Sequence, residues 1–265
     1  MPEESANIYN EFHRAALQIL LARNAVTKKE FELEIIPRLN SQFKTSYQVA
    51  PVISMINNKL RDIGFSINES VCDDGYTYYC FINTTSDFIS AMGSLSKEYL
   101  CVLRYVVELI NEYEGTEGHD DNLGISTLRC LLDAKTPVGS HDTYTSLPKD
   151  RNTILSELFT YNWLSAYKCS NKVTVIGGPR LIAELGNWLV NVVQLPECPI
   201  CMDPVVGGLH CPHCGTALHR RCAYRSLVSL ETTGDDVEKG FCPSCHERWI
   251  AELDNFTNNG FIYRS

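Results

Sequence analysis

The sequence is as informative in what it lacks as in what it contains. No apolar run approaches the roughly 20 residues that span a bilayer. The first five residues are polar and acidic, without the apolar segment of a signal peptide. No P-loop, Gly-x-Ser-x-Gly or dinucleotide fingerprint occurs. We therefore expect no membrane contact, and nothing favours a hydrolase or a nucleotide-dependent enzyme.

Positive charge is also scarce. The chain has 23 Lys and Arg against 32 Asp and Glu, a formal net charge of -9, and no basic cluster typical of an import signal or a DNA-binding arm. Such a chain does not attract a polyanion through its bulk charge. We expect any contact with DNA to be indirect, through a partner. With 265 residues and 44% hydrophobic content, the chain can bury a sizeable core and holds two or three domains.

Cysteine is abundant, and most of it is arranged in one series. Seven of the 12 cysteines and one histidine follow the spacing C-x2-C-x9-C-x2-C-x4-H-x2-C-x19-C-x2-C. Two ligands separated by two residues form a tight turn, called a knuckle, that holds structural zinc. Four such pairs fill two tetrahedral sites. The pattern predicts two zinc ions and a reducing compartment, the cytosol or nucleus. The eight predicted ligands are Cys198, Cys201, Cys211, Cys214, His219, Cys222, Cys242 and Cys245.

Two arrangements can use these ligands. In a sequential arrangement, neighbouring pairs share a metal. In the cross-brace, which we favour, the first and third pairs share one zinc and the second and fourth pairs share the other. Three further histidines lie beside ligands in the sequence. We expect them not to coordinate metal, because each zinc already has four ligands. These are His210, His213 and His246.

The region before the zinc ligands shows the same order of predicted elements twice. Helical periodicity begins at Ile8, a capping box at Thr27–Glu30 opens a second helix that Pro37 should end or kink, and a third helix covers about 46–61 with Gly64 after it. Strands over 65–71 and 76–82 then flank a turn. Helices followed by a hairpin are typical of a winged helix.

The second unit repeats this order. We predict helices over about 96–113 and 126–133 and around Ile154–Phe159, strands over 163–167 and 172–176, and a closing helix from Pro179 to about 193. Loops are expected over 114–122 and 134–148. The predicted fold is α+β: winged helices at 1–93 and 94–194, a cross-brace zinc domain at 195–250 and a tail at 251–265.

Two families use a C4-H-C3 cross-brace: RING-type domains, which recruit a ubiquitin-conjugating enzyme, and PHD fingers, which bind histone tails. PHD fingers usually carry Trp two residues before the seventh ligand, where this chain has Gly240. RING-type domains favour an aliphatic residue in the first knuckle and Pro after the seventh ligand, here Ile200 and Pro243. We favour a RING-type domain with these two residues contacting the conjugating enzyme. Ile200 can alternatively serve only to pack the knuckle.

One position departs from strong RING ligases. These usually carry a basic residue after the eighth ligand, which clamps the ubiquitin thioester, and this chain has His246 there with Arg248 nearby. We therefore expect weak activity alone. Catalysis would be indirect, by orientation of a thioester, without a catalytic residue from this chain. The acidic segments at His119–Asp121 and 231–240 are interpreted as solvated loops.

The whole arrangement resembles one family: non-SMC element one, a subunit of the SMC-five/six genome-maintenance complex. The residues that carry the resemblance are Phe12-His13-Arg14 to Leu20-Leu21, Tyr161-Asn162-Trp163-Leu164, Cys211 to Gly215, Leu218 to Cys222, and Cys242 to Trp249.

The resemblance implies a nuclear, zinc-containing ubiquitin ligase subunit that acts in DNA repair and recombination. It also implies a double winged-helix partner of the MAGE type, which would stimulate the ligase, and a kleisin-like subunit. Few Lys or Arg lie on the third helix of either unit, which favours protein docking over DNA binding. The alternatives are a non-catalytic scaffold, whose zinc domain only stabilises an interface, and a PHD-type histone reader.

Overall fold

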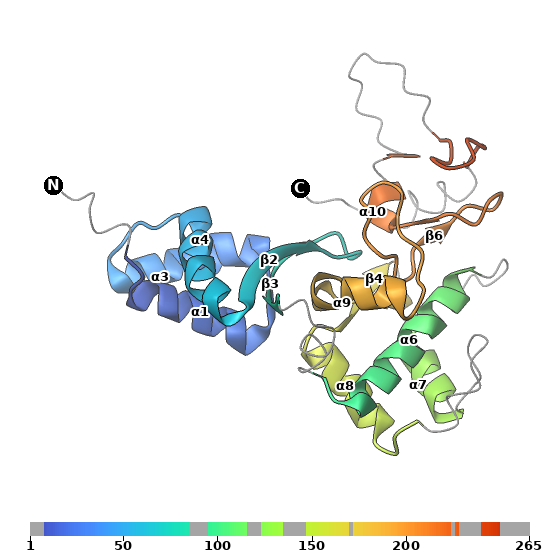
Figure 1. Ribbon diagram of the computed structural model, residues 1–265, viewed down its shortest axis with the longest axis horizontal. Coiled ribbons are helices and arrows are strands. Elements are labelled where there is room, and N and C mark those ends of the chain that lie inside the picture. Colours follow the sequence, from blue (N-terminus) through green and yellow to red (C-terminus); the bar gives the residue numbers. More distant parts are fainter. Residues whose placement is uncertain are drawn as a thin grey trace, which may run out of the picture.

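The computed structural model describes residues 8–84, 95–115, 123–134, 147–169, 172–223, 226–227 and 240–249. It is a mixed helix-and-strand protein built from three units along the chain (Figure 1). The first unit lies at one end of the molecule, and the second and third units lie together at the other. Within the described ranges, no helix is both long and apolar enough to span a membrane.

The first unit begins with three helical regions and one short strand. Its elements are α1 (Glu11–Arg23), β1 (Ala25–Thr27), α2 (Lys28–Glu30), η2 (Phe31–Ile35), α3 (Ile36–Phe43), α4 (Val49–Leu60) and η3 (Arg61–Ile63). The predicted cap at Thr27 is confirmed, because its hydroxyl accepts a hydrogen bond from the Glu30 N–H at 3.2 Å. Gly64 ends the third helical region in the left-handed conformation, as predicted (φ 74°).

Pro37 changes the second helical region without ending it. The residues just before it, Phe31–Ile35, form a π-helix, and the Ile36 N–H donates to the Phe31 carbonyl. An α-helix then resumes with Pro37 in its first turn. Proline has no N–H, and its ring clashes with the carbonyl of the preceding turn. A wider π-turn is one way for a helix to accommodate such a break.

The predicted hairpin of the first unit is present, with an additional strand. β2 (Phe65–Val71) pairs antiparallel with β3 (Thr77–Asn83), and β1 pairs with the other edge of β3, giving the order β1-β3-β2. Sequence analysis missed β1, because three residues are too few to show the alternation of a strand. Ile67 and Tyr79 face the core of this unit, which they share with helical residues.

The second unit follows the predicted order. Its elements are α6 (Lys97–Gly115), α7 (Ile125–Ala134), α8 (Arg151–Thr160), β4 (Leu164–Cys169), β5 (Lys172–Gly177) and α9 (Pro179–Asn191). α6 continues two residues beyond its predicted end. Most of both predicted loops, at 116–122 and 135–146, lies outside the described residues. The Val175 N–H donates to the Leu123 carbonyl at 2.9 Å, so Leu123 contacts β5 as β1 contacts β3 in the first unit.

The first and second units are joined through the hairpin of the first. Cys80 and Ile82 of β3 form a small buried cluster with Ala25 and with Ala183 of α9. A polar contact supports this junction, since the Asn162 side-chain amide donates to the Arg23 carbonyl at 2.9 Å. The hairpin therefore has one face in each unit.

The third unit contains the predicted metal ligands and packs on the second. Its elements are β6 (Leu209–His210), β7 (Ala217–Leu218) and α10 (Arg220–Ala223). Val206 is buried in the core of the second unit, and the Gly207 N–H donates to the Asn111 side-chain oxygen of α6 at 3.1 Å. The metal-ligand unit is thus fixed to α6 through both apolar and polar contacts.

Candidate metal centres

Three of the four ligand pairs have the same local structure. In each, the N–H of the first cysteine donates to the carbonyl of the residue five positions further along the chain. The pairs are Cys198 with Asp203, Cys211 with Thr216 and Cys242 with Glu247, at 2.9, 3.0 and 2.9 Å. This hydrogen bond folds each C-x2-C segment into a tight knuckle. The repeated spacing therefore produces three equivalent turns, each of which presents two thiols to a metal cluster.

The residue directly after each of these knuckles has a left-handed backbone conformation. Met202, Gly215 and His246 have φ values of 64°, 72° and 59°, and each N–H donates to the carbonyl of the first cysteine in its knuckle. Only Gly215 takes this conformation without steric cost. The strain at Met202 and His246 is retained because the surrounding turn determines the backbone there.

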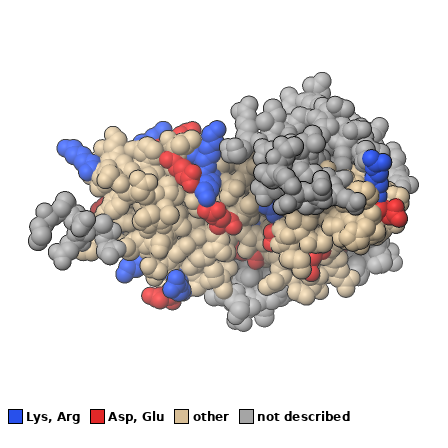
Figure 2. All heavy atoms as spheres, turned by 90° about the horizontal axis from the view of Figure 1, so that it is seen from above, with Lys and Arg blue, Asp and Glu red and all other residues tan. Residues whose placement is uncertain are grey.

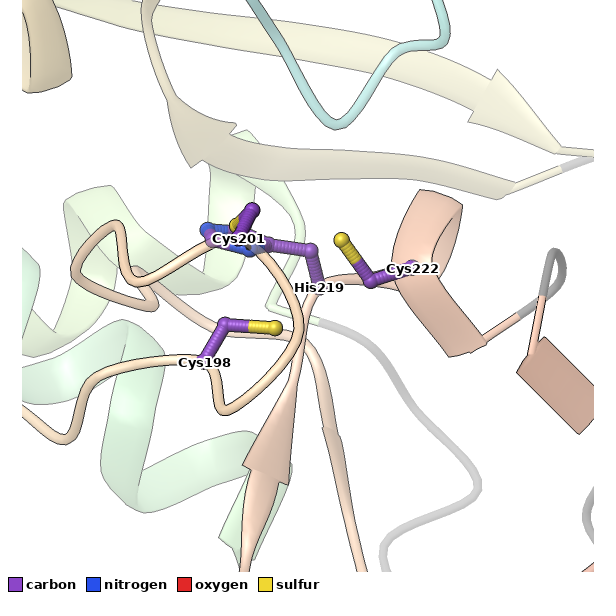
Figure 3. A group of neighbouring side chains, drawn as sticks. All are labelled: Cys198, Cys201, His219 and Cys222. Atoms are coloured by element: carbon purple, nitrogen blue, oxygen red, sulfur yellow. Dashed lines mark hydrogen bonds between the residues drawn. The ribbon is translucent and has the colours of Figure 1, made fainter. Parts of the chain in front are cut away.

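The first cluster contains Cys198, Cys201, His219 and Cys222, whose ligand atoms all lie within 4.8 Å of one another. Figure 3 shows the four side chains pointing toward a common centre. The Cys201 Sγ lies 3.2 Å from the His219 Nδ1. Cys198 is fully buried and Cys222 nearly so. This grouping joins the first and third pairs, as the cross-brace predicts.

The second cluster contains Cys211, Cys214, Cys242 and Cys245, within the same 4.8 Å limit. The Cys211–Cys245 and Cys214–Cys242 sulfur atoms are each 3.7 Å apart. A disulfide has a sulfur separation of about 2.05 Å, so these are not disulfides. Four sulfurs at about 2.3 Å from a tetrahedral zinc are about 3.8 Å from one another. The observed spacing fits zinc.

The imidazole of His219 is oriented by a second contact. Its Nε2 lies 3.1 Å from the Pro204 carbonyl oxygen, and it donates its proton there. The other nitrogen, Nδ1, therefore faces the thiols, 3.2 Å from the Cys201 Sγ, where it can coordinate a metal in place of its proton. A carbonyl partner of this kind fixes both the tautomer and the ring orientation of a metal-binding histidine. Sequence analysis found His219 but had no signal for Pro204, because the contact forms only in the folded unit.

The ionisable groups of the first cluster are close enough that the protonation of each depends on the others. Hydrogen bonds from Cys201 and Cys222 lower the pKa of Cys198 far below that of a free thiol, while Cys198 raises the pKa of Cys222. Burial lowers the pKa of His219, but the thiols of Cys198 and Cys201 outweigh burial and raise it to about 10. A cluster that holds thiolate and imidazolium charges so closely is suited to a divalent cation, which replaces the protons.

The remaining predicted site residues lie at the surface of the same unit. Ile200 is 42% exposed in the first knuckle, and its neighbour Met202, which sequence analysis did not single out, is 66% exposed. Pro243 is half-buried in the last knuckle, and His246 is exposed. Neither cluster includes His210, His213 or His246, as expected. The segments at His119–Asp121 and 231–239 lie outside the described residues, as does the predicted tail.

The fold and the two clusters define a mixed helix-and-strand protein with a pair of cross-braced Cys/His sites suited to metal. Comparison with known proteins is consistent with this class. The model of the family described as "Nse1 non-SMC component of SMC5-6 complex" matches residues 13–123. That match ends before the metal clusters.

Two curated relatives extend over more of the chain. A protein of Xenopus tropicalis named non-structural maintenance of chromosomes element 1 homolog is 23% identical over 94% of this chain and 86% of its own length. The homolog of Xenopus laevis is 23% identical over 78% of this chain and 72% of its own. A chain of a solved structure, the "Nse1-Nse3-Nse4 complex", covers 91% of this chain and 97% of its own, with a TM-score of 0.63 and 21% identity. Together these findings confirm the resemblance to the non-SMC element one family.

Proposed function

We propose that this protein is a zinc-dependent, RING-type ubiquitin ligase subunit of a chromosome-maintenance complex of the SMC5-6 type. The observation that carries the proposal is the position of Ile200. Its side chain is exposed at the tip of a knuckle whose two cysteines belong to the first cluster. A knuckle that needed Ile200 only for its own packing would bury it.

The exposed apolar surface around this knuckle suits a conjugating enzyme. Met202 adds a second exposed apolar side chain, and Pro243 contributes a partly exposed ring from the other cluster. Exposed apolar groups gathered on a small unit are typical of a protein-binding site. Because the chain supplies no nucleophile there, its contribution would be to hold the thioester of the conjugating enzyme in a reactive orientation.

Zinc is the proposed metal at both clusters. Thiolate and imidazole donors in tetrahedral groups of four select zinc, and sites with four protein ligands are structural. The third unit has a small core, with Val205, Leu218 and Trp249 among its few buried apolar residues. Such a core contributes little stability by itself, so we propose that the metal supplies much of the folding free energy of this unit.

The first two units are proposed to be winged helices that bind partner subunits. Both have helices followed by a hairpin, and in both the second hairpin strand pairs with the segment that follows the first helix. The proposed domains are 1–93, 94–194 and 195–250, with a tail at 251–265. The structurally similar chain belongs to a complex named for Nse1, Nse3 and Nse4. We accordingly propose a MAGE-type partner and a kleisin-like partner, and a nuclear location.

Surface charge agrees with protein partners. On the face drawn in Figure 2, described Lys and Arg residues are interspersed with Asp and Glu, without a broad basic field. A DNA-binding face would concentrate positive charge. The PHD alternative is disfavoured by Gly240, because its φ of 88° suits glycine and would strain the Trp that PHD fingers usually carry at this position.

Ubiquitin discharge from a charged conjugating enzyme tests the proposal. The full chain is assayed alone and with a MAGE-type partner, as wild type and as Ile200→Ala. We expect partner-dependent discharge that falls by about tenfold or more in Ile200→Ala, as for loss of a central contact residue. His213→Ala is the matched control, because His213 is also exposed and occupies the position of Ile200 in the knuckle of the second cluster. It should discharge ubiquitin like wild type.

Zinc content and partner binding are measured on the same samples. Both should remain unchanged in Ile200→Ala, since the side chain is exposed and is not a ligand. If discharge stays at background for wild type while the partner binds tightly, the ligase proposal fails. The third unit would then be a structural interface, the scaffold alternative.

A further inference from the structure

Met202 combines a strained backbone with an exposed apolar side chain. It directly follows the first knuckle, its φ is 64°, and it is 66% exposed. A residue with a Cβ adopts the left-handed conformation only at a cost in free energy, which the contacts around it must offset. Gly215 has the same place after the second knuckle, and glycine takes this conformation without that cost. The first knuckle therefore needs support that the second does not.

Arg221 of α10 contacts the residues on both sides of Met202. Its Nη2 donates to the Asp203 Oδ2 at 3.3 Å and to the Cys201 Sγ at 3.9 Å. The Asp203 carbonyl also accepts the hydrogen bond from the Cys198 N–H that closes the knuckle. A single guanidinium nitrogen thus holds a metal ligand on one side of the strained residue and the closing residue of the turn on the other.

The guanidinium group is itself held in place by its surroundings. The Arg221 side chain is only 8% exposed, whereas that of Asp203 is 48% exposed. The next residue, Cys222, lies on α10 across the first cluster from Cys201 (Figure 3). Hydrogen bonds from a guanidinium to a carboxylate are stronger than those between neutral groups. Arg221 therefore connects the first knuckle to the helix on the opposite side of the metal site.

The segment that Arg221 holds also carries the exposed apolar surface of the proposed function. Ile200 and Met202 flank the ligand Cys201 in the sequence, and both side chains are exposed. If Met202 relaxed out of the left-handed conformation, its N–H would leave the Cys198 carbonyl, to which it donates at 2.8 Å. The knuckle would then open, and Ile200 would move together with the metal ligand.

We infer that Arg221 is a positioning residue for the first knuckle, because it holds the strained Met202 from both sides and thereby fixes Cys201 and Ile200 together. This inference rests on the proposed metal site and the proposed surface for a conjugating enzyme. It explains why a side chain is present at a position that suits glycine: Met202 adds apolar surface, and Arg221 offsets the strain. The contribution of Arg221 should therefore depend on the presence of the Met202 side chain.

Zinc release tests this dependence. The zinc-loaded full chain is mixed with a chromogenic chelator, and release is followed for wild type, Arg221→Gln, Met202→Gly and the double variant. Arg221→Gln should accelerate release from one of the two sites by about tenfold, the range of a lost hydrogen bond to a charged group. In the Met202→Gly background, the same substitution should accelerate release by no more than about threefold, because glycine has no strain to offset.

His246→Gly is the matched control for this suppression. His246 has the same left-handed conformation, with a φ of 59°, after the third knuckle, whose two cysteines belong to the second cluster. Glycine at this position removes the same kind of strain from a segment that Arg221 does not hold. Arg221→Gln should therefore retain its full acceleration of zinc release in the His246→Gly background.

Asp203→Asn breaks the same contact from its exposed side, which keeps the test decisive if Arg221→Gln does not fold. The substitution preserves the shape of the side chain and removes its charge. Because the carboxylate is half-exposed, the expected acceleration of zinc release is smaller, about threefold. Met202→Gly should suppress this acceleration as well.

The outcomes separate this inference from the proposed function. Acceleration of equal size with and without the Met202 side chain would overturn the inference, as would release from Arg221→Gln at the wild-type rate. In excess zinc, half-maximal discharge by Arg221→Gln should need about threefold or more of the conjugating enzyme, because Ile200 is no longer fixed. A wild-type chain that never discharges ubiquitin would overturn the ligase function and leave the zinc results to decide the role of Arg221. A wild-type chain that binds no zinc would overturn the metal site and this inference together.

Discussion

An added methyl group at Gly177 should weaken the contact between the second and third units. The added Cβ would lie 2.9, 3.1 and 3.3 Å from three carbons of Val206. Val206 is buried and β-branched, so it has few alternative rotamers with which to withdraw. Overpacking of this kind costs about 1–3 kcal/mol. Alanine also lowers the conformational entropy of the unfolded chain, which stabilises the folded state by about 0.4–1 kcal/mol. We therefore expect Gly177→Ala to lower the free energy of unfolding by about 1–2 kcal/mol.

The assay is urea unfolding of the zinc-loaded chain, followed by tryptophan fluorescence. Trp163 and Trp188 both belong to the core of the second unit, so they report on the affected region. Gly186→Ala is the matched control. Gly186 lies in α9, where an added Cβ comes no closer than 3.9 Å to Pro204, and alanine is the better helix former. This variant should be as stable as wild type or up to about 1 kcal/mol more stable.

Val206→Ala provides the complementary test. It removes two of the three carbons that the new methyl group would meet, Cγ1 and Cγ2, so the double variant should lose less stability than the two single losses added together. The reasoning is refuted if Gly177→Ala and Gly186→Ala have the same stability, or if the two losses at 177 and 206 simply add. Either result would mean that the third unit does not press on the second at this point.

Two further predictions concern the metal and the first unit. His219→Ala should reduce the zinc content from two ions per chain to one, measured by elemental analysis, while Cys130→Ser, which changes a cysteine outside both clusters, should retain two. Burial lowers the pKa of His13 below its ordinary value of 6.5, so the unfolded chain binds a proton more readily than the folded one. The contribution of His13 to the free energy of unfolding is present above pH 6.5 and declines as the pH falls below it. Thermal unfolding of wild type and His13→Gln is measured between about pH 5 and 8. The decline due to His13 should appear only in wild type.

The sequence determined the local elements and the ligand set. Helical periodicity and caps located the helices, because an apolar face repeats every three to four residues wherever a helix packs on a core. The spacing of Cys and His revealed the ligands, because a knuckle needs its two donors two residues apart. The three C-x2-C knuckles share one hydrogen-bonding pattern, whereas the His219–Cys222 pair, with the same spacing, leads into α10.

Contacts between segments far apart in the sequence could not be predicted from local sequence patterns. β1 was missed because a three-residue strand is defined by its partner, β3, and has no signal of its own. The π-turn before Pro37 was predicted only as an end or a kink, since sequence shows that a helix is interrupted there without showing how the chain relieves the clash. The Pro204 carbonyl, which orients His219, likewise becomes a partner only after folding.

By itself, the sequence determined which residues form helices, hairpins and knuckles, because those depend on neighbours within a few positions. Tertiary structure alone decided how the units meet: the hairpin of the first unit under α9, Cys72 against the Gly177 carbonyl, and Val206 in the core of the second unit. These contacts join residues separated by about 30 to 150 positions in the sequence. Their physical basis is the fit of shape and charge between surfaces that exist only once each unit has folded.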